Sequence, residues 1–413
     1  MVLFSFYEFI LYIICDKIKL VMYMIKNVEV LGSLTGKNSK NDTLARFKVG
    51  GTDLGMPLYN SVTNEMFLAF GDTFSDPFGP DRPDLIFKRR WRSNTLAKIK
   101  LSDNYSQGIE IVDFLKNEKT NIAKSIIQGH HTKDDENLEV TKIPTGMIEI
   151  DGNLYMFYFS IRTWKPIATM NYGGCLKSVD NGKTWNRVYD LTWTDETNRK
   201  YDAQTEKLIN EHATNVVHKL QFVKSSKKID VEEHRGHFYT LIFPKDGLDG
   251  YIYLFGECGY RKRGIKLARV KKEYFENFAD YEYMVDTNSD KEPIWVKGKE
   301  GIELQKKNVN SYLITSPSGE MSVAYNKYLN KWLLFKISED GHQVLMYTAN
   351  NIYGPYDKPI EVIQNTDSKI PNPLIYAPLT HEKLFEQDGK IMNILLSLWV
   401  PHYNPVVLRV TLE

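Results

Sequence analysis

Cysteine and histidine are sparse in this sequence. Its 413 residues include three cysteines, Cys15, Cys175 and Cys258, whose spacing matches no metal-binding or redox motif and does not report the compartment. The pairs His130-His131 and His234-x-x-His237 have no third ligand at metal-binding spacing, so we interpret them as loop residues. No metal site and no cofactor are therefore predicted. No pattern in this sequence indicates a structural cation in a central channel either.

An excess of one charge is also lacking. Lys and Arg number 53 and Asp and Glu 52, which gives a net charge of +1 and no basic field for nucleic acid. The local basic run 88–92 (KRRWR) is interpreted as a solvated loop or as part of a substrate cleft. A G-x-S-x-G elbow, a phosphate-binding loop and a dinucleotide fingerprint are absent, which argues against the enzyme classes built on them.

Long apolar runs occur only at the N-terminus, where Val2 to Cys15 is interrupted by Glu8 alone. This run is short for a membrane span, and it lacks the basic start and the small-residue cleavage site of a signal peptide. Residues 1–26 are interpreted as an extension: a mis-called start, with Met22 or Met24 as the true one, an uncleaved anchor or a poor signal peptide. Membrane association is expected only through residues 1–24, if they are real. Residues 27–413 are predicted to form one domain.

What the sequence does have is repeated strands, with 42% hydrophobic and 13% aromatic residues. Five aromatic-aliphatic runs follow turn residues such as DGN and QDG, which suit hairpins. These runs are Glu65–Asp72, Asn153–Arg162, Gly250–Gly259, Lys331–Ser338 and Lys390–Trp399.

Further strand-like runs flank each of the five. Those that follow are Asn94–Leu101, Gly173–Val179, Ile265–Val270, Val344–Ala349 and Val406–Leu412; those that precede are Thr52–Tyr59, Gly146–Ile150, Phe238–Phe243, Glu320–Tyr325 and Leu379–Phe385. Five antiparallel meanders without helical alternation predict an all-β fold, a five-bladed β-propeller. A two-domain β-sandwich is the alternative.

The remaining segments fit this fold. The strand-like run Val28–Leu34 is expected to complete the last blade and close the ring. Residues 103–142 and the helical pattern of residues 201–224 are interpreted as insertions over one mouth. Ser178 to Trp185 matches the Asp-box turn S-x-D-x-G-x-T-W of sialidase-like propellers, in which Asp180 has a structural role.

Two aspartates are the main candidates for chemistry. Asp53 precedes one strand-like run, Asp72 ends the next, and the turn 60–64 (NSVTN) lies midway between them. A hairpin closed by this turn brings the carboxylates opposite each other, where like charges destabilise a fold. The pair therefore calls for a functional explanation. Two nearby carboxyls with different surroundings can serve as acid and base in glycoside hydrolysis.

Other polar and aromatic residues are expected at strand ends around the same mouth, where they could contact sugar. The polar candidates are Asn41, Asp42, Arg92, Asn94, Arg162, Glu257, Arg263, Glu320 and His402. Either Glu257 or Glu320 could be a third carboxylate that tunes the pair. Trp91, Trp164 and Trp399 could stack on sugar rings, and each is equally explained by packing.

The sequence resembles a bacterial and phage family known as a domain of unknown function (number 4185) and associated with endo-acting D-arabinanases on a five-bladed propeller. The resemblance runs from about Val28 to the C-terminus. It rests on residues 31–32 (LG), 34–36 (LTG), 41–43 (NDT), 51–55 (GTDLG), 70–74 (FGDTF), 93–97 (SNTLA), 319–326 (GEMSVAYN) and 397–404 (SLWVPHYN). The positions of Asp53 and Asp72 match those that the family is thought to use for catalysis.

The resemblance implies a glycoside hydrolase that acts within a D-arabinan-like furanoside polymer through Asp53 and Asp72. A carbohydrate-binding or adhesion propeller without turnover is the alternative from another class. A sialidase-like hydrolase is a third, for which no feature marks the tyrosine nucleophile. The expected partner is a polysaccharide or oligosaccharide, and the protein is expected to be a monomer. Such a substrate favours a secreted or cell-surface location, which the N-terminus does not clearly support.

Overall fold

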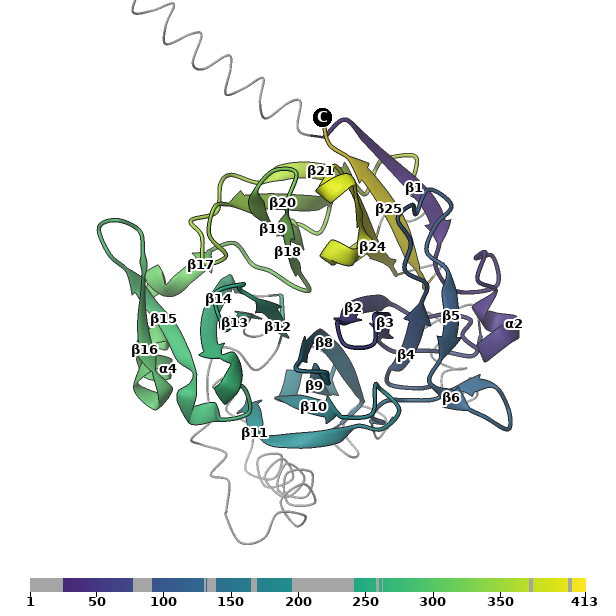
Figure 1. Ribbon diagram of the computed structural model, residues 1–413, viewed down its shortest axis with the longest axis horizontal. Helices are drawn as coiled ribbons and strands as arrows, with labels where there is room; N and C mark the ends of the chain where they lie inside the picture. The colour runs from purple at the N-terminus through teal and green to yellow at the C-terminus, as the bar shows by residue number, and fades with distance from the viewer. Residues whose placement is uncertain are drawn as a thin grey trace, which may run out of the picture.

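A computed structural model describes residues 25–76, 91–129, 131, 139–164, 169–194, 241–257, 260–261, 263–370, 374–399 and 403–413. Five antiparallel sheets surround a common axis as the blades of a propeller (Figure 1). The predicted five-bladed β-propeller is therefore confirmed. The predictions for residues 1–24, 201–224, His130, His234, His237 and His402 and for most of the run 88–92 lie outside the described residues.

Each blade is built outward from an inner strand that faces the axis. The first has β2 (Leu54–Asn60), β3 (Glu65–Phe70), β4 (Thr95–Ile99) and β5 (Ile111–Phe114); the second has β8 (Thr141–Ile150), β9 (Asn153–Thr163), β10 (Thr169–Ser178) and β11 (Asn186–Thr194). The third has β12 (Leu241–Asp246), β13 (Tyr251–Glu257), β14 (Ile265–Lys271), β15 (Glu282–Thr287) and β16 (Pro293–Lys297), with β17 (Tyr312–Ile314) beside β14.

The last two blades complete the circle. The fourth has β18 (Ser322–Asn326), β19 (Lys331–Ile337), β20 (Gln343–Ala349) and β21 (Ile360–Gln364); the fifth has β22 (Ile375–Leu379), β24 (Ile391–Leu398), β25 (Pro405–Thr411) and β1 (Asn27–Ser33), with β23 (Phe385–Glu386) beside β24. Outside the blades lie the hairpin β6 (Lys116–Asn117) and β7 (Ile122–Ala123), the helices α2 (Thr43–Phe47) and α4 (Gly298–Lys307), and the 3-10 turns η4 (Lys272–Tyr274), η5 (Phe278–Asp280), η6 (Val309–Ser311), η7 (Glu382–Leu384) and η8 (Gln387–Gly389).

The ring is closed by the strand nearest the N-terminus. β1 pairs antiparallel with β25, with Asn27 opposite Thr411 and Val30 opposite Leu408 (Figure 1). Val28 of β1 is buried in an apolar cluster that the fourth and fifth blades share. The pairing covers an edge that would otherwise present unpaired backbone groups. The predicted completion of the last blade by an N-terminal strand is confirmed.

Two strand predictions need correction. The predicted insertion 103–142 contains β5, the outer strand of the first blade. The predicted run Leu379–Phe385 is not an inner strand, because Ile375–Leu379 fills that position and η7 follows it. The ring nitrogen Nδ1 of His381 accepts the N–H of Lys383 and caps this turn. A side chain that bonds to the nearby backbone favours a turn over an extended strand.

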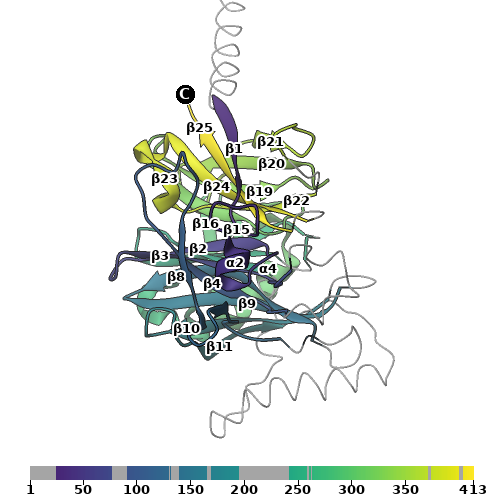
Figure 2. The same ribbon diagram turned by 90° about the vertical axis from the view of Figure 1, so that its right-hand side faces the viewer.

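The inner strands run in one direction, so their starts share one mouth of the ring. Asp53 lies just before β2, Thr141 begins β8, Glu320 lies just before β18, and Tyr376 is the second residue of β22. The side view shows the blades as a thick disc around the axis (Figure 2). One continuous apolar cluster links all five blades beneath this mouth and makes a rigid platform for polar groups at the rim. No described helix is long and apolar enough to cross a membrane.

The Asp-box turn connects the first two blades. Asp180 accepts hydrogen bonds from Thr184 N at 2.9 Å, Thr184 Oγ1 at 2.6 Å and Ser178 Oγ at 2.8 Å. The neighbouring Asn181 accepts a hydrogen bond at 2.9 Å from Nδ2 of Asn60, the last residue of β2. This geometry gives Asp180 a structural role.

Candidate active site

A bulge in the backbone places Asp53. Leu54 has φ +65° and Gly55 has φ +104°, and the register between β2 and β3 shifts between Leu54 and Met56. A left-handed leucine is uncommon, and such conformations collect at functional sites. Ser397 Oγ of the fifth blade accepts the Leu54 N–H at 2.8 Å and holds this turn in place. The bulge aims the side chain of Asp53 into the mouth.

The neighbouring strand brings Asp72 to the same mouth. Leu54 pairs with Phe70 and Gly51 bridges to Phe74, so Asp53 and Asp72 lie across from each other on adjacent strands. A Cβ at Gly71 would collide with Oδ1 of Asp53, which explains a glycine immediately before Asp72. The predicted hairpin geometry is therefore present.

Two threonines join the segments that carry the aspartates. The hydroxyls of Thr52 and Thr73 lie 2.8 Å apart, and Thr73 Oγ1 also lies 3.1 Å from Thr95 Oγ1. All three threonines are fully buried. The matched motifs 51–55 and 70–74 thus contain both the carboxylates and the hydrogen bonds that fix the spacing between their strands.

Asp53 is buried among two tyrosines from the fifth blade. Its carboxyl is 8% exposed, and the hydroxyl of Tyr376 donates to Oδ2 at 2.8 Å. Burial raises the pKa of Asp53 to about 7; the hydroxyls of Tyr376 and Tyr403 and the charge of Arg261 oppose this rise, and the charge of Glu320 adds to it. The second oxygen, Oδ1, is buried and accepts no hydrogen bond of standard geometry from the described residues. Oδ1 is therefore the oxygen of Asp53 that is suited to accept a hydrogen bond or a proton from a bound molecule.

Asp72 has different neighbours, from the first and second blades. Its Oδ1 accepts hydrogen bonds from Trp91 Nε1 at 2.7 Å and from Thr141 Oγ1 at 2.5 Å. The side chain is 9% exposed, and burial together with the charge of Asp53 raises the pKa of Asp72 to about 8, against the two hydrogen bonds. Burial and the charge of the neighbouring carboxyl thus make the loss of both protons costly, so the pair retains at least one proton near neutral pH.

A third carboxylate and an arginine face the pair from the fourth and third blades. Glu320, 5% exposed, accepts hydrogen bonds from Arg261 Nε at 3.2 Å and Nη2 at 2.7 Å. The guanidinium also lies over the rings of Tyr260 and Tyr376, 4.9 and 5.2 Å from their centroids. Glu320 is therefore the predicted third carboxylate that the structure brings near Asp53, with its charge balanced by Arg261.

Aromatic side chains border the mouth. The indole of Trp399 is 41% exposed and meets Tyr376 and Tyr403 edge-on, at centroid distances of 6.3 and 5.5 Å. Trp164 meets Tyr260 edge-on at 5.7 Å on the side of the second and third blades. An exposed indole held at its edge suits stacking on a sugar ring. Trp91 differs, because the ring of His131 stacks on it.

Four of the predicted sugar-binding residues hold the rim together instead. The buried amides of Asn41 and Asn94 bond to the backbone, Asn41 to Leu34, Ile109 and Ile111 and Asn94 to Ile126, Ile127 and Lys142. Arg92 is buried and donates to the carbonyls of Lys48 and Ala123, and Asp42 caps helix α2. The side chains of these four residues are thus bonded to protein groups.

The other predicted residues lie in different places. Glu257 is fully buried at the end of β13 and accepts the Arg263 N–H at 3.3 Å, while the Arg263 side chain is exposed. Arg162 lies on β9, and its side chain is not among the described groups; His402 lies outside the described residues.

Sequence reasoning missed several residues that contact the pair. Tyr403 lies in the motif 397–404, which could have indicated it. Tyr376, Thr141 and Arg261 had no comparable signal, because they come from three other blades and meet Asp53, Asp72 and Glu320 only in the folded ring.

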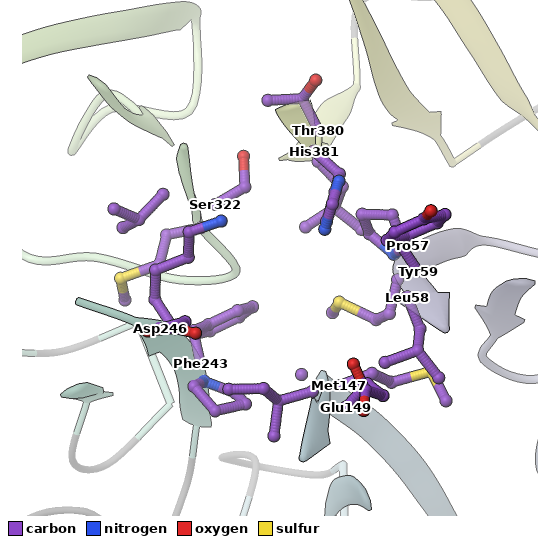
Figure 3. A pocket seen from close by; sticks show the side chains of 18 residues that line it. Pro57, Leu58, Tyr59, Met147, Glu149, Phe243, Asp246, Ser322, Thr380 and His381 are labelled. Atoms are coloured by element: carbon purple, nitrogen blue, oxygen red, sulfur yellow. The ribbon is translucent and has the colours of Figure 1, made fainter. Parts of the chain in front are cut away.

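A separate cavity occupies the axis of the ring. Its volume is about 180 Å³, and residues from all five blades line it, among them Tyr59, Glu149 and His381 (Figure 3). Tyr59 and Glu149 lie near the ends of β2 and β8, away from the strand starts that carry the aspartates. Burial lowers the pKa of His381 to about 4, so this imidazole is neutral at physiological pH. No cluster of three or more His, Cys, Asp or Glu able to hold a metal occurs among the described residues.

Comparison with known proteins places the chain in a family. The model of the family described as Domain of unknown function (DUF4185) matches residues 38–409. The chain belongs to the DUF4185 family. The match contains Asp53, Asp72 and every residue that contacts them. No curated protein matches the chain.

The chain is also similar to solved structures of other proteins. A protein from Bacteroides ovatus, provisionally described as a hydrolase, is 12% identical with a TM-score of 0.51, covering 93% of this chain and 94% of that one. An α-L-arabinofuranosidase from Podospora anserina in complex with cellotriose is 11% identical (TM-score 0.42, 92% and 94% covered). A GH43_1 enzyme from Xanthomonas citri is 8% identical (TM-score 0.42, 95% and 92% covered). At 12% identity, the likeness to the Bacteroides ovatus protein concerns the fold alone.

Proposed function

We propose that this DUF4185 protein is a glycoside hydrolase that cleaves within a polysaccharide, with a D-arabinan-like furanoside polymer as its substrate. The observation that carries the proposal is the pair of buried carboxyls, Asp53 and Asp72, held across from each other at one mouth of the ring with raised pKa values. Like charges in such a place destabilise the fold, so a chemical role is the better explanation. The choice of an arabinan follows the family resemblance of the motifs around both residues.

The surroundings assign different roles to the two groups. Asp53 accepts a hydrogen bond from Tyr376 and lies near the cation of Arg261, and both favour its ionised form. The charge of Asp53 raises the pKa of Asp72, so Asp72 stays protonated when Asp53 is ionised. Asp72 is then the general acid that protonates the leaving oxygen. Asp53 is the carboxylate that takes the proton of the attacking water or attacks the sugar itself.

Residues around the pair are assigned supporting roles. Glu320 and Arg261 set the potential at Asp53 from the opposite side of the mouth. The exposed indole of Trp399, next to the tyrosine that contacts Asp53, is the sugar-stacking surface. Cleavage inside the polymer follows the family resemblance: a polymer that lies across the mouth would place an internal bond between the carboxyls.

The test compares the wild type with Asp53→Asn and Asp72→Asn on D-arabinan, arabinogalactan and unrelated glycans. We expect oligosaccharides from a furanoside polymer with the wild type and a loss of at least about a hundredfold with each variant, because one catalytic proton transfer is removed. The reaction mixtures are resolved by chromatography. Lys327→Gln, at an exposed position in the turn between β18 and β19, is the control and should keep full activity.

Two results would overturn the proposal. One is a wild type that binds glycan and releases nothing, which would indicate a binding module. The other is an active wild type that both amide variants match.

A further inference from the structure

The ring of His131 lies flat on the indole of Trp91, next to the acid pair. The two ring centroids are 3.8 Å apart and the planes differ by 4°, so the stack is nearly parallel. Phe74 also packs on Trp91, at 6.0 Å and 25°. These contacts restrict the indole at the point where its Nε1–H donates to Asp72. The indole N–H of Trp91 thus binds the Asp72 carboxyl, while the ring packs against Phe74 and His131.

His131 is itself fixed by neighbours from the rim. Ser93 Oγ accepts the Gly129 N–H at 2.7 Å and lies 2.8 Å from Nε2 of His131. Gln128 Nε2 lies 2.9 Å from Nδ1 of the same ring. Because the amide nitrogen of Gln128 can only donate, to Nδ1, the ring proton lies on Nε2, which donates to Ser93 Oγ. The backbone N–H of His131 donates to the Val140 carbonyl at 3.0 Å. A ring held at both nitrogens and at its backbone has a set orientation.

We propose that His131 is a positioning residue, which through its stack holds the Trp91 indole so that the N–H stays on Asp72. The inference rests on the proposed function in so far as Asp72 is a working carboxyl. A donor held in place stabilises the ionised carboxyl more than a mobile one does, because no ordering is needed when the charge forms. Other groups near Asp72 also affect its pKa: Thr141 donates a hydrogen bond to it, and the charge of Asp53 acts on it. Lys142 and Glu139, which flank Thr141 in sequence, form an ion pair with each other at 2.5 Å. The contribution of the His131–Trp91 stack to the pKa of Asp72 adds to the effects of these groups.

The test measures the proton affinity of Asp72 directly, without substrate. Carboxyl carbons of ¹³C-labelled aspartate are titrated by NMR in the full chain, with the Asp72 signal assigned through Asp72→Asn. We expect His131→Ala to raise the pKa of Asp72 by about half a unit or more, because the indole hydrogen bond loosens. His131→Phe, which keeps a flat ring, should stay close to the wild type, and Trp91→Phe should shift the pKa at least as far as His131→Ala.

The controls separate positioning from general damage. His342→Ala removes a histidine from an exposed turn of the fourth blade and should leave the Asp72 signal unchanged. If His131→Ala does not fold, His131→Leu fills the space without an aromatic ring and takes its place. With an active wild type, the alkaline limb of kcat/KM should move to higher pH in His131→Ala, and the acidic limb should stay.

The outcomes distinguish this inference from the proposed function. An Asp72 pKa in His131→Ala and His131→Leu equal to that of the wild type would overturn the inference, even in an active glycosidase. A shifted pKa in a protein that cleaves no glycan would overturn the proposed function and leave the positioning of Trp91 established.

Discussion

At the scale of single residues, the two aspartates are alike in burial and unlike in their partners. Asp53 accepts from a tyrosine of the fifth blade, and Asp72 accepts from an indole and a threonine of the first two. Burial raises the pKa of both carboxyls toward neutrality, and their neighbours place Asp53 near 7 and Asp72 near 8. Different partners around two similar groups are the means by which one site holds an acid and a base at one pH.

The first prediction concerns the pH dependence of activity. The working state has Asp53 ionised and Asp72 protonated, so kcat/KM should fall below about pH 7 as Asp53 gains a proton and above about pH 8 as Asp72 loses one. Initial rates on the polymer between pH 5 and pH 10 would show a narrow bell. A plateau that extends down to pH 5 would contradict the raised pKa of Asp53.

The second prediction concerns stability. Because the folded-state pKa of both carboxyls lies above the unfolded value near 4, the folded state binds protons more tightly, and stability should fall as pH rises from about 4 to about 8. The Asp72→Asn variant carries no charge at this side chain, so the contribution of Asp72 to this pH-dependent loss of stability is absent. At pH 8 we expect its free energy of unfolding to exceed that of the wild type by at least about 1 kcal/mol, with little difference at pH 4. Denaturant titrations at both pH values provide the comparison.

The sequence alone predicts the pair Asp53 and Asp72, but few of the residues that contact it. A hairpin is a local structure, so the turn at residues 60–64 was enough to place Asp53 and Asp72 together. Tyr376 meets Asp53 across 323 positions of sequence, and Arg261 meets Glu320 across 59. Contacts between blades depend on the closure of the ring, which no local pattern encodes. Asn94 was expected to face sugar, and its amide is instead used by the backbone of a neighbouring loop.

At the scale of elements, the strongly apolar second strand of each blade was the easiest to predict. β9 and β24 are buried along almost their whole described length, which matches their aromatic and aliphatic sequences. The outer strands β5 and β21 are short and have only one paired edge, and they carry exposed residues, Val112 in β5 and Glu361 and Gln364 in β21. Their sequences therefore resemble loops. The inner strand β22 was missed because it is five residues long, contains Pro378 and leads directly into a capped turn.

The third prediction belongs to the Asp-box turn. Asp180→Ala removes three hydrogen bonds to a charged acceptor, from Ser178 and Thr184. We expect a loss of about 1–2 kcal/mol in the free energy of unfolding and no change in kcat, because the turn connects blades and lies outside the acid pair. Thermal unfolding and activity assays on the same preparation test both parts. A large fall in kcat with unchanged stability would give Asp180 a functional role instead.

At the scale of the whole molecule, the ring makes the site. The residues around the acid pair come from all five blades: Trp91 from the first, Thr141 from the second, Arg261 from the third, Glu320 from the fourth and Tyr376 from the fifth. Any opening between the first and fifth blades would separate Asp53 from Tyr376 and Leu54 from Ser397. The strand that closes the ring should therefore affect both stability and chemistry.

The last prediction tests that connection through Val28 on β1. Val28 is buried against the fourth and fifth blades, so Val28→Asp places a charge in an apolar cluster and should cost at least about 3 kcal/mol of stability. Loss of β1 exposes the edge of β25, and we expect self-association by size-exclusion chromatography together with loss of activity. Glu29→Ala, at an exposed position of the same strand, is the matched control. A Val28→Asp protein that remains monomeric, stable and active would show that the ring holds without its N-terminal strand.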